Sequence, residues 1–98
     1  MTLTLKTEEE IRKNIGGINA SPSFVTFLTD VEIAAKGANE FLGLPEGTTV
    51  IVNSAKIVGT GLEITFDSYG DGSSVFEDDS ETSATVGFGS FEVEIRFK

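Results

Sequence analysis

The segment 91–97 alternates strictly between apolar and polar side chains, and this pattern constrains the fold more than any other in the chain. Strict alternation is typical of a strand with one face buried and the other in water. Residues 62–67 show the same alternation, and a run rich in β-branched residues, 49–58, precedes them across Gly59-Thr60-Gly61. The pattern therefore predicts a β-hairpin and a C-terminal strand in an antiparallel sheet.

The parity of the alternation changes close to the C-terminal strand. Ala84, Val86 and Phe88 are apolar at even positions, whereas the strand that follows is apolar at odd positions from Phe91. A bulge at Gly89 or a short turn would produce this change, and we favour a bulge or kink that bends the sheet. At the other end of the chain, Leu3 and Leu5 predict a further short edge strand.

A short helix is predicted to begin at Glu8. Thr7 and Glu10 match a capping box, in which each side chain accepts a hydrogen bond from the other residue's backbone N–H. Acidic residues follow in the first turn and basic residues in the last, which suits the helix dipole. Gly16-Gly17 is expected to end this helix.

A second, long amphipathic helix is predicted over residues 22–42. Ser21-Pro22 is a typical helix start, and apolar residues recur at three- and four-residue steps from Phe24 to Leu42. Gly43 is expected to end the helix. The phenylalanines on its apolar face either cover the sheet or fill a partner's groove, and the sheet's need for a cover favours core packing.

These elements predict a single domain, 1–98, with an α+β fold. A short helix and then a long one occupy a helical half, 1–47, and pack on an antiparallel sheet of three to five strands in an acidic β half, 48–98. The order of the strands is left open. A chain of 98 residues is too small for a deep enclosed pocket.

The net charge of −9 comes from one part of the sequence. Residues 57–95 hold nine acids and no Lys or Arg, whereas the rest of the chain balances seven acids against seven bases. Such a surface repels nucleic acids and anionic membranes and attracts basic proteins, although an acidic balance also serves solubility alone. The predicted partner-binding residues are Glu63, Asp67, Asp71, Glu77, Asp78, Asp79, Glu81, Glu92 and Glu94.

The absence of His and Cys excludes a Ser-His-Asp triad, imidazole and thiolate metal ligands, and disulfides. We therefore expect a non-catalytic protein without a cofactor. One motif suggests calcium, because Asp67, Asp71 and Asp78 fall at positions one, five and twelve of an EF-hand count. Tyr69 occupies the third ligand position, and a turn built from Gly and Asp explains the same letters, so calcium binding stays open.

No apolar run approaches the roughly 18 residues of a membrane span, and no basic segment precedes an apolar one at the N-terminus. The sequence thus predicts a soluble protein without a signal peptide. Its expected location is a virion or a host cytoplasm. We expect direct binding neither to membranes nor to nucleic acids.

The segments 5–12 and 15–19, followed by the predicted long helix ending at Phe41-Leu42-Gly43, resemble the opening of tailed-phage head-to-tail connector and neck subunits. In that family, too, a short capped helix precedes a longer one. The resemblance implies a virion structural subunit that works through repeated protein contacts and forms homo-oligomers. It assigns no functional residue. The contacts would come from strand edges and from the acidic loop expected over residues 68–83.

A second hypothesis is a monomeric acidic inhibitor. Carboxylates spaced along strands and a loop can imitate the charge of nucleic-acid phosphates. Such a mimic, of anti-defence or anti-CRISPR type, would block a basic site on a host protein. An accessory domain whose charge serves only solubility is the third alternative.

Overall fold

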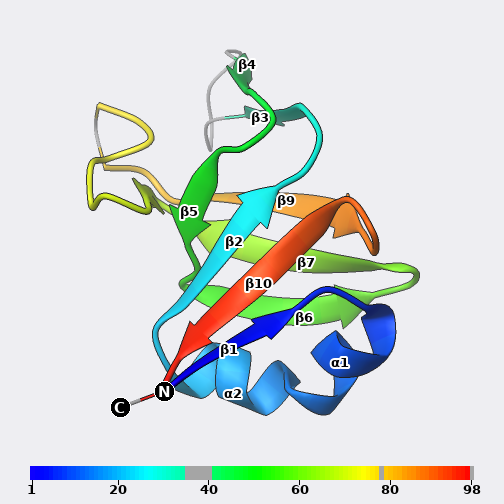
Figure 1. Cartoon of the computed structure of the whole chain (residues 1–98). Coiled ribbons are helices and arrows are strands. Elements are labelled where there is room, and N and C mark those ends of the chain that lie inside the picture. The colour runs from blue at the N-terminus through cyan, green and yellow to red at the C-terminus, as the bar shows by residue number, and fades with distance from the viewer. Residues whose placement is uncertain (35–40, 78, 98) are drawn as a thin grey trace.

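Two antiparallel sheets and a separate hairpin make up most of the computed structural model, which describes residues 1–34, 41–77 and 79–97 (Figure 1). The five-stranded sheet has the order β1 (Thr2–Leu5), β10 (Phe91–Arg96), β2 (Ser23–Phe27), β5 (Thr49–Ile51) and β8 (Ser68–Tyr69). The three-stranded sheet has the order β6 (Ser54–Val58), β7 (Gly61–Phe66) and β9 (Thr82–Gly87). The hairpin pairs β3 (Val31–Ala34) with β4 (Phe41–Leu44). Two helices, α1 (Glu8–Lys13) and α2 (Ile15–Ala20), lie across one end of the sheets.

The two larger sheets pack face to face and bury their apolar sides. Burial alternates along β7, β9 and β10, as the sequence alternation predicts. Phe27 of β2 and Phe66 of β7 meet across the interface with ring centroids 6.3 Å apart, and both are fully buried. Removal of these apolar faces from water is the main driving force for such a sandwich.

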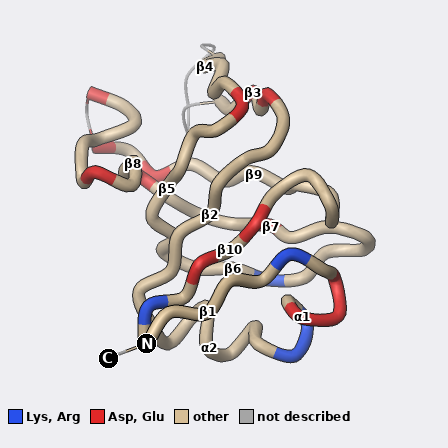
Figure 2. Tube along the Cα trace, in the orientation of Figure 1, with Lys and Arg blue, Asp and Glu red and all other residues tan. Residues whose placement is uncertain are grey.

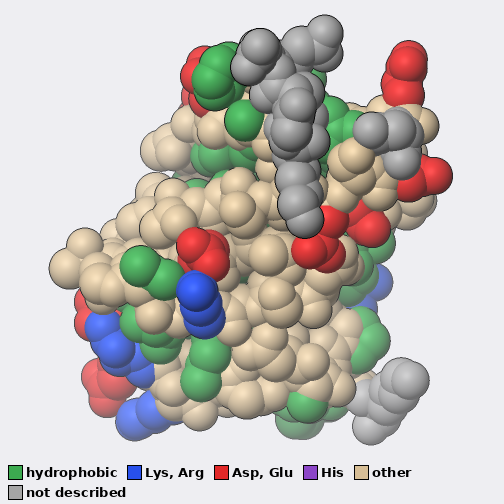
Figure 3. Space-filling view, turned by 180° about the vertical axis from the view of Figure 1, so that it is seen from behind, with side chains coloured by type: hydrophobic (Ala, Val, Ile, Leu, Met, Phe, Trp, Pro, Cys, Tyr) green, Lys and Arg blue, Asp and Glu red, His purple; other side chains and the backbone are tan. Residues whose placement is uncertain are grey.

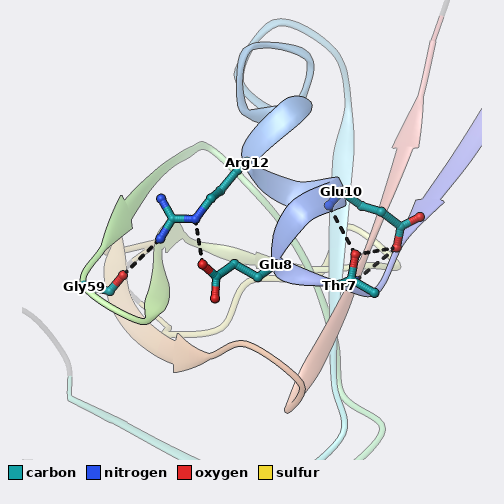
Figure 4. Close-up of polar contacts among 5 residues, drawn as sticks. All are labelled: Thr7, Glu8, Glu10, Arg12 and Gly59. Carbon is teal, nitrogen blue, oxygen red and sulfur yellow. Dashed lines mark hydrogen bonds and ion pairs between the residues drawn. The ribbon is translucent and has the colours of Figure 1, made fainter.

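The capping box at the start of α1 is confirmed. The Thr7 hydroxyl accepts a hydrogen bond from the Glu10 N–H (3.2 Å), and a Glu10 carboxylate oxygen accepts from the Thr7 N–H (3.1 Å; Figure 4). Arg12 pairs with Glu8 (2.8 Å) and donates to the Gly59 carbonyl (3.4 Å). The last contact connects α1 to the turn between β6 and β7.

Replacing Thr7 by alanine is expected to destabilise the protein by about 1 kcal/mol, because the cap on α1 is lost.

The pKa of Glu10 lies below its usual value, since its carboxylate accepts from the backbone N–H of Lys6 and then from the N–H and hydroxyl of Thr7. Glu10 therefore stabilises the fold above its ordinary pKa, and this contribution disappears as pH falls through the lowered value. Denaturation of wild type and Glu10→Gln across that acidic range measures it. A stability difference that stays constant with pH would contradict it.

The predicted end of the first helix at Gly16-Gly17 is wrong. Helix α1 ends at Asn14, whose side chain donates to the Glu10 carbonyl (2.8 Å), and α2 then runs through both glycines. Ile11 and Ile18 anchor the helices, one buried side chain from each. Burial of these side chains outweighs the low helix propensity of glycine.

The long helix predicted over 22–42 is also wrong, and with it the α+β fold class. The described residues of this range form β2, β3 and the start of β4, while 35–40 lie outside the described residues. In its described residues, 1–34 and 41–47, the supposed helical half contains four strands and only two short helices. Strand β2 lies between β10 and β5, so long-range backbone pairing overrides the local helical period.

A turn, and not the favoured bulge, separates the last two long strands. Strands β9 and β10 belong to different sheets, and the chain passes between them at residues 87–90. The N–H and the hydroxyl of Ser90 both donate to the Gly87 carbonyl, and Gly89 has a φ of 97°, which favours glycine. The parity changes because each sheet turns its apolar side toward the other.

Other strand predictions agree with the structure. The short edge strand at Leu3 and Leu5 is confirmed as β1, which pairs with β10. The predicted hairpin across Gly59-Thr60-Gly61 is confirmed as β6 and β7, although the run 49–58 divides into β5 and β6, which lie in different sheets. At Gly61 a Cβ atom would lie 2.7 Å from the Val86 carbonyl oxygen, so glycine allows β9 to approach.

Candidate protein-interaction site

The predicted acidic residues do not share one face. Glu63 lies on β7 in the three-stranded sheet, whereas Glu92 and Glu94 lie on β10 in the five-stranded sheet. Because the two sheets pack through their apolar sides, these acids point toward opposite surfaces of the sandwich. The condition for one acidic patch, that these strands are neighbours, is therefore not met.

The acids on the strands also have basic partners within the chain. Glu63 pairs with Lys56 (3.4 Å), Glu94 with Arg96 (3.2 Å), and Glu92 with Lys6 (3.9 Å). Such surface pairs contribute about 0–1 kcal/mol each to stability, but they offset the charge of the carboxylates locally. The strand acids are thus poor candidates for attracting a distant basic partner.

Residues 67–81, which we call the acidic segment, hold several acids that lie away from the basic residues (Figure 2). Among the described residues, no ion pair involves its acids, which are Asp67, Asp71, Glu77, Asp79 and Glu81. Asp78, also predicted to bind a partner, lies outside the described residues.

The acids of this segment take hydrogen bonds from neutral donors. Asp71 accepts from the N–H and hydroxyl of Ser73 (2.9 and 2.6 Å), and the hydroxyl first and then the N–H lower its pKa. Glu81 accepts from the Asn53 amide (2.8 Å), and Asp79 accepts from the Ser74 hydroxyl. Neutral donors keep a carboxylate ionised without cancelling its charge.

The described residues give no support to the calcium motif. No group of three His, Cys, Asp or Glu side chains in this part of the chain is placed to hold a metal ion. Asp71 bonds within its own turn, and Asp67 accepts from the neighbouring Ser68 hydroxyl (3.0 Å). Asp78, the twelfth position of the count, lies outside the described residues, so calcium binding by the whole motif stays open.

An open groove of about 440 Å³ lies on the outer face of the five-stranded sheet. Its polar side chains already have partners: the Arg96 guanidinium lies 4.1 Å from the centre of the Phe24 ring and pairs with Glu94, and Thr49 bonds to Thr26 (2.8 Å). The wall beyond them is formed by Tyr69 and Gly70. Nothing in this groove points to a particular ligand.

The two edges of the three-stranded sheet differ. The β6 edge is covered at Ala55 by Asn19 of α2, whose side-chain amide donates to the Ala55 carbonyl (2.9 Å) and whose oxygen accepts from the Ala55 N–H (2.8 Å). At this residue one side chain takes the place of a neighbouring strand. This contact occupies backbone groups that would otherwise be free to pair with another chain.

The β9 edge has no such cover among the described residues, where β7 is its only strand partner. The Phe88 N–H donates to the Thr60 carbonyl in line with the β7–β9 register, so the even-numbered residues of β9 bond toward β7. Antiparallel alternation then directs the N–H and C=O groups of Ser83 and Thr85 outward. The register between β6 and β7 leads to the same assignment, because Ala55 bonds to Asn19 and so directs its backbone groups away from β7.

Strand β9 lacks the usual protection of an exposed edge. Natural edge strands are commonly short, charged, bulged or interrupted by proline. Residues 82–87 contain no charge and no proline, and they pair with β7 over all six positions. The space-filling view from behind shows charged side chains in several separate places with uncharged surface between them (Figure 3). Strand β3 also lies against β9, and the Thr82 hydroxyl donates to the Ala34 carbonyl (2.8 Å) near this edge.

The other open edge, β1, is better protected. It has four residues, and positive charge flanks it from the Met1 ammonium and from Lys6. The sequence analysis named the acids as binding residues and did not name β9 as a binding edge, although the uncharged run between Glu81 and Glu92 is visible in the sequence. Only the topology reveals that this run forms an edge.

No helix in the described part of the chain is long and apolar enough to cross a membrane.

Comparison with protein-family models gives no match, and comparison with curated proteins gives no significant match either.

Proposed function

We propose that this chain is a non-catalytic protein that works through protein–protein contacts, and that a partner strand adds to the β9 edge. The observation that carries the proposal is the contrast between the two edges of one sheet. Asn19 satisfies the outward N–H and C=O groups of Ala55 on the β6 edge, whereas those of Ser83 and Thr85 have no partner among the described residues. Strand addition supplies affinity through such backbone groups.

A virion head or neck assembly is the setting that we propose for these contacts. The capped helix α1 resembles the short helix expected at the start of phage connector subunits and supports this setting, whereas the strands formed by the described residues of 22–42 remove part of the resemblance. Repeated strand-edge contacts suit a subunit that builds a larger structure.

The β9 proposal predicts that Thr85→Pro abolishes partner capture. Proline removes the outward N–H of Thr85 but leaves the ladder to β7 intact, because that N–H does not bond to β7. Wild-type protein and the variant serve as immobilised baits in a lysate of the source organism. Partners retained by wild type and lost by Thr85→Pro are the expected result.

The matched control is Thr4→Pro on β1. The Phe97 N–H donates to the Met1 carbonyl in line with the β1–β10 register, so the Thr4 N–H also points outward from an edge. This control should retain the partners. Identical capture by wild type and Thr85→Pro would refute strand addition at β9.

The acidic segment supports a second candidate, the inhibitor that blocks a basic site on a host protein. None of its described acids has a basic partner among the described residues, so their field extends into solvent. For a captured basic partner, Glu77→Gln with Asp79→Asn should weaken binding and flatten its dependence on salt. The control is Glu63→Gln, because Lys56 already pairs with Glu63. An unchanged salt dependence in the double variant would remove the segment from the mechanism.

A further inference from the structure

We infer that the strand added to β9 is β9 of a second copy of this chain, which pairs antiparallel about a two-fold axis at Ala84. This inference rests on the proposed function and names the partner at the same edge. It follows from three properties of the edge: the direction of its backbone groups, the placement of its side chains and the distribution of charge.

The backbone groups of the edge complement themselves. With the axis at Ala84, Ser83 lies opposite the partner's Thr85, and the outward N–H and C=O groups of both residues pair on both copies. A register centred on Thr85 would instead place Ser83 opposite the partner's Gly87. The Gly87 carbonyl already accepts from Ser90. The register centred on Ala84 instead pairs the N–H and C=O groups of Ser83 and Thr85, which have no other described partner.

The side chains also fit this symmetry. A two-fold axis perpendicular to the sheet keeps each face on its own side, so Ala84 and Val86, both buried, continue the apolar face across the interface. Ser83 and Thr85 remain on the outer face, where both are exposed. The small Ala84 side chains meet at the axis, where close approach is needed.

Charge favours the antiparallel arrangement. Each copy carries a net charge of −9, but residues 82–87 contribute none of it. Antiparallel pairing brings Glu81 beside the partner's Gly87 and keeps the two Glu81 side chains at opposite ends of the interface. The remaining repulsion between acidic copies is screened by salt, so this dimer strengthens as ionic strength rises. Binding to a basic host protein would weaken under the same change.

The test is the solution mass by light scattering over a concentration series at low and high salt. Wild type and Thr4→Pro should form dimers that tighten with salt. Thr85→Pro should weaken the dimer by a factor on the order of ten or more, because each copy loses an interface N–H. A wild-type monomer at every concentration, or a dimer that survives Thr85→Pro, would overturn the inference. The capture experiment with immobilised protein is a separate measurement. A monomeric wild type would therefore not exclude strand addition by another protein at β9.

Amide exchange on the wild-type protein provides a second test that needs no folded variant. The Ser83 and Thr85 amides should exchange quickly in dilute protein and become protected as the concentration rises. The Ala84 amide bonds to β7 and should be protected throughout. Exchange of Ser83 and Thr85 that does not depend on concentration would refute the second copy as the partner.

Discussion

Replacing Phe66 by alanine is expected to destabilise the protein by about 3–5 kcal/mol, the range for deletion of a buried aromatic side chain. Phe66 on β7 is fully buried against Phe27 on β2, so its ring joins the two sheets. The loss combines the transfer free energy of the ring with the cavity that it leaves. Domains of this kind have only about 5–15 kcal/mol of total stability, so the variant should be close to unfolding.

Denaturant unfolding monitored by far-UV circular dichroism measures this effect. The matched control is Phe41→Ala on β4, where the side chain is 70% exposed and the change should remain within about 0.5 kcal/mol. Equal losses in the two variants would show that Phe66 does not join the sheets as described.

Replacing Asn19 by alanine is expected to cost about 1–3 kcal/mol and to open the β6 edge. The side chain of Asn19 bonds to both the N–H and the C=O of Ala55, and truncation leaves both groups without a protein partner. The uncovered edge becomes a template for another strand, so we expect the variant to associate further than wild type does.

Thermal unfolding and light scattering together test this prediction. Asn53→Ala is the control, because Asn53 is exposed and its side-chain amide donates to an exposed carboxylate, that of Glu81. Asn19→Asp retains the acceptor for the Ala55 N–H and loses the donor, so an intermediate stability is expected. If Asn19→Ala proves as stable and as soluble as the control, Asn19 is not what protects the edge.

The sequence was informative where local rules and tertiary structure agree. The capping box at Thr7 is satisfied entirely within one turn, and the alternation in β7 and β10 reports the burial of one face directly. Both patterns are therefore visible without knowledge of the partner strands.

The prediction failed where an apolar pattern fits two periods. Phe24 and Phe27 lie three residues apart, as on a helix, yet they lie on opposite faces of β2. The apolar Phe24 ring can lie on the outer face because the Arg96 guanidinium covers it. These two residues are distant in the sequence. Val25 and Thr26 are β-branched and favour a strand, a local signal that the helical period obscured.

The site was harder to predict than the fold. Charge is visible in a sequence, so the acids were named, but their pairing with Lys6, Lys56 and Arg96 depends on which strands are neighbours. An open edge has no residue signature of its own. It depends on strand order, which here places β9 at the margin and β10 in the interior of its sheet.

The interior position of β10 has a consequence for how the chain folds. Strand β10 lies between β1 and β2, so Thr2 pairs with Arg96 and Phe27 with Phe91 only after nearly the whole sequence has left the ribosome. Closing loops of this length costs entropy before any contact compensates for it, and sheets rich in such pairings refold in roughly milliseconds to seconds. Until then β1 and β2 lack their common neighbour. During synthesis these two strands are thus exposed to pairing with other chains until β10 emerges.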